Sequence, residues 1–271
     1  MSSKTKKFIS PNAWFSFEYP AAWSEFADEQ STFLFYNAGV WDGNFRISAY
    51  RGEKNYGESV IREELKHDKK AQTISIGGKK AIYTPHEFEE DNVKYVSHNY
   101  LVGEDCMAFE CSFTTYKDAT TKVAEDIIKS IIIRQDGVKY APELINIRLN
   151  EIDFINDCYE WVVSSVKKKY AVSFDGEEKD IAILQQFADS GDIGKKKRDE
   201  WIAVGIALCV IITNEVEGAE WHTLIDGNRE DAVLMYNGKM IDPMKLAWSK
   251  IKNGLSVNLE EEYTKALTEK E

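Results

Sequence analysis

Histidine is the side chain that most readily gains or loses a proton near neutral pH, so acid–base catalysis would show first at histidines. His222, within the stretch EWHTLID, is the best placed, because Glu220 precedes it by two residues and Asp226 follows it by four. Either carboxylate could orient the imidazole. The pattern places no serine or cysteine to be its nucleophile. We therefore take His222 and Asp226 as candidate binding residues and assign no catalytic residue.

The other three histidines have structural explanations. His67 is expected to end an exposed helix face, and His86 is expected to lie in a loop beside Pro85. His98 falls in an alternating stretch, where a surface position between neighbouring strands is more common than a ligand position.

The sequence also predicts no metal site and no cofactor. Its four cysteines have no CxxC spacing, and three of them have apolar neighbours, as buried thiols do. The segment 226–231 lacks the loop length and the ligand spacing of an EF-hand. The glycine pair at 77–78 is followed by two lysines, but neither glycine-rich phosphate-binding pattern surrounds it, so it indicates a hairpin turn.

Trp41 differs from the other tryptophans because it stands in a turn with Gly39, Asp42 and Gly43. Most of the seven tryptophans are expected in the core, since this side chain buries a large apolar area. Trp41 could instead be an exposed anchor for a binding partner. Packing over the edge of a sheet is the alternative interpretation, and both stay open at this point.

Charge restricts the partners that the protein can have. The 271 residues carry a net charge of −12, and the part after Arg134, with 17 basic and 26 acidic residues, contributes −9 of it. An acidic protein repels phosphate backbones, so nucleic acid and anionic membranes are not expected as partners. A protein partner would present a basic face. The alternative is that the charge serves solubility alone.

Neither a targeting segment nor a membrane span is predicted. The chain begins with MSSKTKKF, and no apolar segment of a secretory signal follows these basic residues. The most apolar run, Trp201 to Ile212, is about a dozen residues long, short of the ~18 to 20 that a membrane-spanning helix needs. We therefore expect a cytoplasmic protein.

Apolar and polar residues alternate through the first half of the chain, which is typical of antiparallel strands with one buried face. Helical spacing occurs there in two places, 56–65 and 117–130. This half is predicted to be an α+β sandwich. The alternating stretches are 14–19, 33–36, 45–50, 72–76, 80–84, 93–102 and 107–114.

The order of these elements, with FSFEYPAAW at the start and a closing helix that ends in KSIII, resembles the PsbP-like fold. The resemblance covers residues 8–134. Members of this fold class include photosystem extrinsic subunits, a Ran-binding protein and bacterial lipoproteins. The resemblance therefore implies a binding or assembly role without a shared chemistry.

Helical patterning replaces the alternation after residues 135–137, and we place a domain boundary between them and Pro142. A long helix is expected from Glu143 to about Tyr170, and a short one over 180–187. The run 201–212 is predicted to be a buried core helix, in which the small residues Ala203, Gly205 and Ala207 allow close packing. These elements make a second, helix-rich domain, residues 140–271.

A three-strand meander follows the core helix, over 219–224, 232–236 and 239–242. Pro243 then opens a helix at its favoured first position, with Asp242 as its cap. This half resembles an uncharacterised bacterial domain of unknown function, and its general layout is similar to that of small immunity-type domains.

The sequence as a whole predicts a bacterial α+β protein of two domains, 8–134 and 140–271, that is a monomer or a weak homodimer. Our first hypothesis is a non-enzymatic protein-binding or interaction module, of which an immunity-like or inhibitor-like protein is one form. The alternative is a hydrolase or transferase with its site in a cleft between the domains, near His222.

Overall fold

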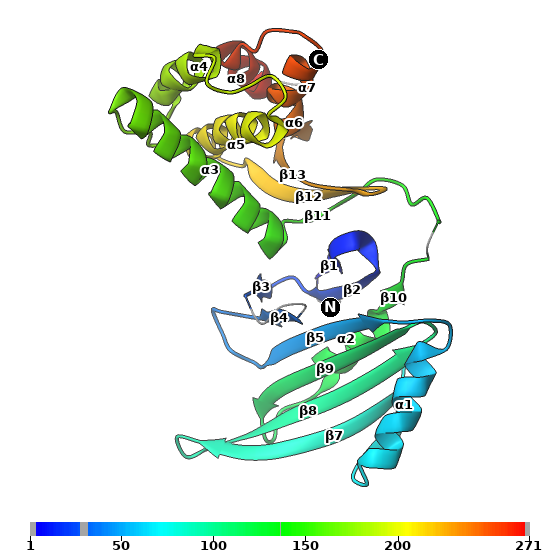
Figure 1. Ribbon diagram of the computed structural model, residues 1–271. Helices are drawn as coiled ribbons and strands as arrows, with labels where there is room; N and C mark the ends of the chain where they lie inside the picture. Colours follow the sequence, from blue (N-terminus) through cyan, green and yellow to red (C-terminus); the bar gives the residue numbers. More distant parts are fainter. Residues whose placement is uncertain (1–3, 28–31, 136, 269–271) are drawn as a thin grey trace. The chain divides into compact units, whose positions relative to one another are not determined.

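The computed structural model describes residues 4–27, 32–135 and 137–268 (Figure 1). The chain divides into two compact units, residues 1–138 and 139–271, and each is described by itself. Asp136, on which part of the predicted domain boundary falls, lies outside the described residues.

The first unit has two antiparallel sheets among its described residues. The larger has seven strands in the order β3-β4-β5-β9-β8-β7-β6, and the smaller has three in the order β1-β2-β10. Two α-helices accompany them. The bounds are β1 Thr5–Ile9, β2 Phe15–Pro20, β3 Ser24–Phe26, β4 Thr32–Tyr36, β5 Asn44–Arg51, α1 Tyr56–His67, β6 Gln72–Ile76, β7 Lys79–Glu90, β8 Val93–Glu104, β9 Met107–Tyr116, α2 Lys122–Ser130 and β10 Ile132–Ile133.

Alternation along the strands gives the seven-stranded sheet an apolar inner face and a polar outer face. On β9, Phe109, Cys111 and Phe113 are buried, whereas Glu110 and Ser112 between them point to the other face. The inner face packs with α2 and with Phe15 and Phe17 of β2 around a core rich in phenylalanine. The α+β sandwich predicted for this half is confirmed.

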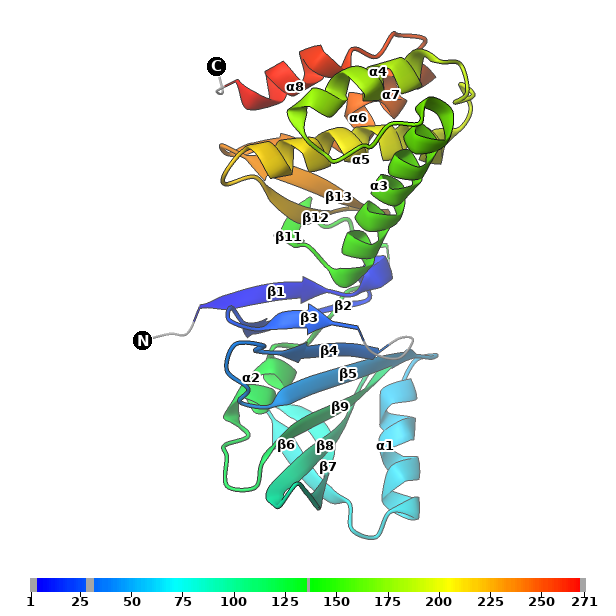
Figure 2. The same ribbon diagram turned by 90° about the vertical axis from the view of Figure 1, so that its left-hand side faces the viewer.

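Helix α1 crosses the outer face, on the opposite side of the sheet from α2 (Figures 1 and 2). Two glycines permit this close approach. A Cβ atom on Gly57 would lie 2.3 Å from the carbonyl oxygen of Met107, and one on Gly103 would lie 2.2 Å from the carbonyl oxygen of Gly57. The helix therefore rests directly on the backbone of β8 and β9 and leaves the remainder of the outer face uncovered by this helix.

Strand β7 is longer than the sequence predicted. Its pairing with β6 ends at Tyr83, whereas its pairing with β8 continues to Glu90. One side of residues 84–90 is thus without a strand partner in the described structure, and Pro85, which has no N–H to donate, fits such a position. His86 lies in this strand, so the prediction that places it in a loop is wrong.

Strands β1 and β3 were not predicted from the sequence, and the predicted start of α2 is too early. Residues 5–9 form a strand that pairs with β2, although the basic residues there give only a weak alternation. Helix α2 begins at Lys122 rather than at residue 117.

The second unit combines helices with a four-stranded antiparallel sheet, in the order β11-β12-β13-β14 over the described residues. The predicted meander is present as β12, β13 and β14, and β11 adds a fourth strand. Residues 143–146 therefore form a strand and not the start of the long helix. The bounds are β11 Glu143–Asn146, α3 Leu149–Tyr170, α4 Ile181–Asp189, α5 Arg198–Glu215, β12 Glu220–Asp226, β13 Arg229–Tyr236, β14 Lys239–Ile241, α6 Pro243–Leu246, α7 Trp248–Lys252 and α8 Leu259–Leu267.

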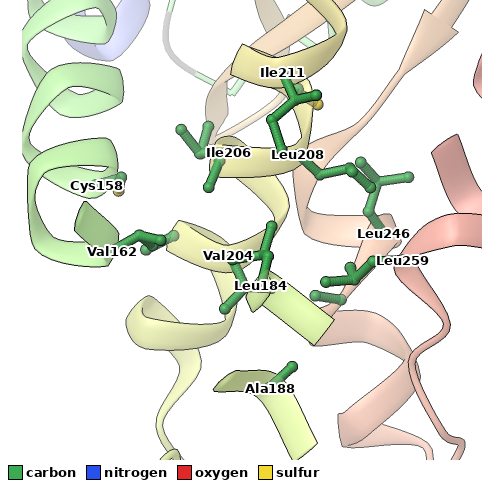
Figure 3. Close-up of a cluster of buried hydrophobic side chains, with 14 of the residues drawn as sticks. Cys158, Val162, Leu184, Ala188, Val204, Ile206, Leu208, Ile211, Leu246 and Leu259 are labelled. Atoms are coloured by element: carbon green, nitrogen blue, oxygen red, sulfur yellow. The ribbon is translucent and has the colours of Figure 1, made fainter. Parts of the chain in front are cut away.

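Helix α5 is the centre of this unit, as the sequence predicts. Val204, Ala207, Leu208 and Cys209 are fully buried, and helices α3, α4, α6 and α8 contribute side chains to the same core (Figure 3). A helix that is apolar all round is stable in water only when neighbours cover each side. Among the described residues, no helix is both long and apolar enough to cross a membrane.

Helix α6 packs on α5 at Gly205. A Cβ atom there would lie 2.1 Å from the carbonyl oxygen of Pro243. Asp242 caps α6 as predicted, since its side chain accepts a hydrogen bond from the backbone N–H of Met244 at 3.0 Å. The small residue in the core helix thus lets the capped turn reach the helix backbone.

We expect Gly205→Ala to lower the free energy of unfolding by about 1 to 3 kcal/mol, because the added methyl group overlaps backbone atoms that cannot rotate away. The overlap outweighs the helix propensity that alanine gains, about 1 kcal/mol. Urea denaturation of the full chain measures the difference. Gly194→Ala is the matched control, since its Cβ would meet Lys197 at an ordinary 3.4 Å. Equal stability of the two variants would contradict the close contact of α5 with α6.

Candidate functional site

Four aromatic side chains, Trp41, Phe88, Tyr95 and Tyr116, gather at one end of the outer sheet face, and we call them the aromatic row. Phe88, Tyr95 and Tyr116 are direct cross-strand neighbours on β7, β8 and β9. Their ring centroids are 5.4 and 5.6 Å apart, with planes inclined by 21° and 23°. Trp41 stands nearly perpendicular to them, with its ring centroid 4.9 Å from that of Tyr116 and 5.9 Å from that of Tyr95.

Trp41 is thus packed on the sheet and half-buried, while Tyr116 keeps 46% of its surface exposed. A shallow pocket of about 390 Å³ adjoins the row and is also lined by Asn44 and Thr114. Because the rings brace one another, they need little ordering to meet a partner. The role of Trp41 as a binding anchor stays a prediction.

A second hollow lies on the same face beside α1, and we call it the polar groove. Its volume is about 500 Å³, within the range of small-molecule sites. It shares no lining residue with the pocket at the aromatic row. The residues that define it here are Arg46, Asp68, Thr84, Asn99, Glu110 and Ser112.

Hydrogen bonds hold the walls of the polar groove in place. The side-chain amide of Asn99 donates to the carbonyl oxygen of Thr84 at 3.1 Å, and the Thr84 hydroxyl donates to Asp68 Oδ2 at 3.3 Å. The hydroxyl of Tyr50 donates to Glu110 Oε2 at 3.3 Å. The contact of Thr84 with Asp68 links the residue after α1 to the sheet, and the other two contacts join neighbouring strands.

Trp41 was predicted from the sequence as a candidate, whereas the rest of the aromatic row and the polar groove were not. The available signal was the alternation of side chains between the two faces of a strand, since Phe88, Tyr95 and Tyr116 all fall on the polar side of their strands. Alternation assigns a residue to a face, but strand register decides which residues of that face are neighbours.

The structure places His222 beside Glu220 but away from Asp226. The imidazole Nδ1 is 3.1 Å from the carbonyl oxygen of Ile145, and Nε2 is 3.8 Å from Glu220 Oε2. Asp226 lies four residues further along β12, roughly 13 Å away at the usual rise of a strand. The expected approach of Asp226 to His222 is therefore absent. Thr223, next in sequence, directs its hydroxyl to Glu151.

His98 is buried rather than on the surface, so the prediction of a surface position is wrong. Only 8% of it is exposed, and its Nδ1 lies 2.7 Å from the hydroxyl oxygen of Tyr83 on the inner face. Its Nε2 has no hydrogen-bond partner in the part of the chain that the structure describes. Burial lowers the pKa of His98, and the nearby charge of Glu125 opposes that shift.

The buried thiols are poor nucleophiles and poor metal ligands. Burial raises the pKa of Cys158 to about 12 and raises the pKa of Cys111 and Cys209 as well. Thiols with such a pKa stay protonated at neutral pH, whereas the thiolate is the reactive form. Within the described ranges, no three histidine, cysteine or carboxylate side chains are grouped so as to hold a metal ion.

The second unit contains a buried ion-pair network that the sequence did not predict. Arg148, 3% exposed, donates to both carboxylate oxygens of Glu151 at 2.7 and 2.5 Å and to Glu230 Oε2 at 2.7 Å. The hydroxyl of Thr223 donates to Glu151 Oε2 at 3.0 Å and accepts from the backbone N–H of Arg148 at 3.1 Å. The network ties β12 and β13 to the start of α3.

An acidic pocket of about 260 Å³ adjoins this network. Its floor includes apolar side chains of α3, α5 and α6, such as Phe154, Ile206 and Met244. Two of its carboxylates, Asp231 and Asp242, pair with Arg229. The carboxylates that line it are Glu151, Asp199, Glu230, Asp231 and Asp242.

Fold and sites together describe an α+β protein of two units with hollows on the surface of each. The chain belongs to the DUF3805 family, a domain of unknown function, whose model matches residues 3–156. A second family model, DUF3806, also a domain of unknown function, matches residues 180–263. No curated protein matches the chain.

A crystal structure from Bacteroides thetaiotaomicron VPI-5482 is 51% identical, covers 98% of this chain and 99% of its own, and has a TM-score of 0.94. The cyanobacterial PsbP of Synechocystis sp. PCC 6803 is 14% identical over 49% of this chain and 95% of its own, with a TM-score of 0.28. LpqN of Mycobacterium tuberculosis, involved in cell envelope biogenesis, is 11% identical over 50% of this chain and 87% of its own, with a TM-score of 0.32. The expected resemblance of the second half to a domain of unknown function is confirmed by the DUF3806 match.

We predict that His98 makes the stability of the protein depend on pH. Its pKa in the folded state is lowered, so below the ordinary value of about 6.5 the unfolded chain binds more protons, and stability falls as the pH decreases. The slope that one such group adds is at most about 1.4 kcal/mol per pH unit. The variant His98→Gln keeps a polar group beside Tyr83. Its stability, measured by thermal unfolding between pH 7 and 5, should fall less steeply than that of the unsubstituted protein.

His67→Gln is the control for this measurement, because His67 is exposed at the end of α1. Its pH profile should match that of the unsubstituted protein. If the stability of His98→Gln fell with pH as steeply as that of His67→Gln and of the unsubstituted protein, carboxylates alone would account for the acid sensitivity.

Proposed function

We propose that this protein is a non-enzymatic binding module of the bacterial cytoplasm, and that a protein partner contacts the aromatic row. The observation that carries the proposal is the row itself, in which Trp41 and Tyr116 lie half-buried or exposed over a rigid sheet. Tryptophan and tyrosine dominate the binding energy of protein interfaces because they bury large areas with few rotatable bonds. The protein would act as a monomer or as a weak homodimer.

The enzymatic alternative, a hydrolase or transferase centred on His222, has less support. His222 has a backbone carbonyl and Glu220 as its polar neighbours, and the side chain of Glu220 is 77% exposed. A general base acts on a nucleophile or a water that a third group holds in place. The contacts of His222 in the described structure do not provide that arrangement.

Trp41→Ala should remove the binding of the partner while the fold persists. Loss of a central aromatic anchor costs about 2 kcal/mol or more, which corresponds to about 30-fold in affinity. The intact 271-residue chain would first be immobilised and exposed to an extract of its own bacterium, and mass spectrometry would identify the bound partner. The affinity of the purified partner for the Trp41→Ala and Tyr116→Ala variants would then be measured.

Val40→Ala is the matched control, because Val40 adjoins Trp41 in sequence, is 71% exposed and takes no part in the row. It should keep the affinity, and all three variants should melt as cooperatively as the parent. A partner bound equally well by Trp41→Ala and Tyr116→Ala would refute the role of the row.

The acidic pocket favours a second form of the hypothesis, in which an immunity-like or inhibitor-like protein uses the second unit to hold a basic partner. Its five carboxylates exceed by one the four cations that pair with them, Arg148, Arg198, Arg229 and Lys245, and the part of the chain after Arg134 carries −9 of the net charge. Opposite charges speed the encounter of two proteins.

Association of the intact chain with such a partner should slow markedly between 0.1 and 1 M salt, as the Debye length falls from about 10 to about 3 Å. Stopped-flow measurement of the association rate would show it, and dissociation should change less. An association rate that is independent of salt would leave the acidic surface a role in solubility alone.

A further inference from the structure

The polar groove lies on the first unit and is separate from the aromatic row. Its ligand can therefore differ from the protein partner proposed for the row. Its volume of about 500 Å³ suits a small ligand rather than a folded protein. Its floor is a face of the seven-stranded sheet, and the end of α1 forms one wall.

The charges of the groove disfavour anionic ligands. Glu64, Asp68 and Glu110 line it and repel anions such as phosphates. Arg46, on β5 next to β9, lines the same hollow and offsets one of these three negative charges. A ligand without net charge does not meet this repulsion.

The remaining lining is rich in groups that both donate and accept hydrogen bonds. Thr84, Asn99 and Ser112 are direct cross-strand neighbours on β7, β8 and β9, and Arg46 continues that line on β5. The hydroxyls of Thr32 and Ser48, 2.8 Å apart, border the hollow beside them. A hydroxyl can donate one hydrogen bond and accept two, an amide offers both roles, and a carboxylate accepts several.

Apolar lining is sparse in comparison. Ile82 and Leu101 are the aliphatic side chains of the groove, and Ile82 is 2% exposed. A lipid or another apolar ligand would find little area to bury there, and each polar group that it covered would lose hydrogen bonds to water. A ligand must therefore match the polar groups one by one.

We propose that the polar groove is a binding site for a neutral saccharide of one or two rings. Each hydroxyl of a sugar can donate one hydrogen bond and accept two, so it can pair with the hydroxyl, amide and charged groups of the groove. Carboxylates and a guanidinium form the strongest hydrogen bonds to them, because one partner is charged. Glu110, which pairs with Ser48, and Arg46, which pairs with Ser112, lie diagonally on the same face of β9 and β5 and are the residues on which affinity depends most.

The test titrates the full-length protein with a panel of neutral mono- and disaccharides, and with spermidine and citrate as cationic and anionic probes. Calorimetry measures the affinity, and chemical shifts of backbone amides locate the ligand. We expect at least one neutral saccharide to bind and to shift the signals of Asn99, Glu110 and Ser112 more than those of the aromatic row. Arg46→Ala and Glu110→Ala should each weaken that binding by about tenfold to a hundredfold.

Glu89→Ala is the matched control, since Glu89 is an exposed carboxylate of β7 outside the groove, and it should bind the sugar as the parent does. The Trp41→Ala variant should do so as well, which separates this site from the proposed protein-binding row. The inference is overturned if no neutral saccharide binds in the millimolar range, if spermidine or citrate binds the groove instead, or if Arg46→Ala and Glu110→Ala bind the sugar unchanged.

Discussion

Strand geometry is the constraint on which the first unit depends, because successive side chains of a strand point to opposite faces of the sheet. Placing Phe109, Cys111 and Phe113 in the core obliges Glu110 and Ser112 to face outward. The same condition holds on each neighbouring strand, so the outer face carries an array of side chains that the core does not need. Register then sets rings beside rings at one end and hydroxyls beside an amide further along.

The second unit meets a different requirement, since its central helix is apolar on every side and has to be enclosed. Enclosure brings polar ends of other elements into dry surroundings, where an unpaired polar group is unfavourable by about 1 to 3 kcal/mol. Asp242 satisfies a backbone N–H of α6, and the network of Arg148, Glu151 and Thr223 satisfies the junction of α3 with the sheet. Charged groups in this unit thus have structural roles that cannot be predicted from their positions in the sequence.

Elements were predicted correctly from the sequence where their pattern of apolar and polar residues is long. Helix α5 and the strands β8 and β9 have long, unambiguous patterns and were assigned correctly. Residues 143–146 carry apolar positions that suit either a helix or a strand, and only pairing with β12 decides between them. His86 follows a proline, which indicates a loop unless the strand lies at an edge. The candidate sites were harder, because Trp41 stood out by composition whereas its neighbours depend on register, and the burial of His98 depends on the faces of three strands together.

Residues 84–90 of β7 have an open edge, and their side chains limit aggregation there. An open strand edge offers unpaired backbone groups on which another extended chain can add itself, and this is a common route to aggregates. Pro85 removes one donor from that edge, and Glu87, Glu89 and Glu90 place like charges along it, so an approaching copy of the same strand is repelled. Such an edge prevents β7, which carries Thr84 and Phe88, from pairing with strands of other copies. The protection matters most during synthesis, when newly made chains lie close together.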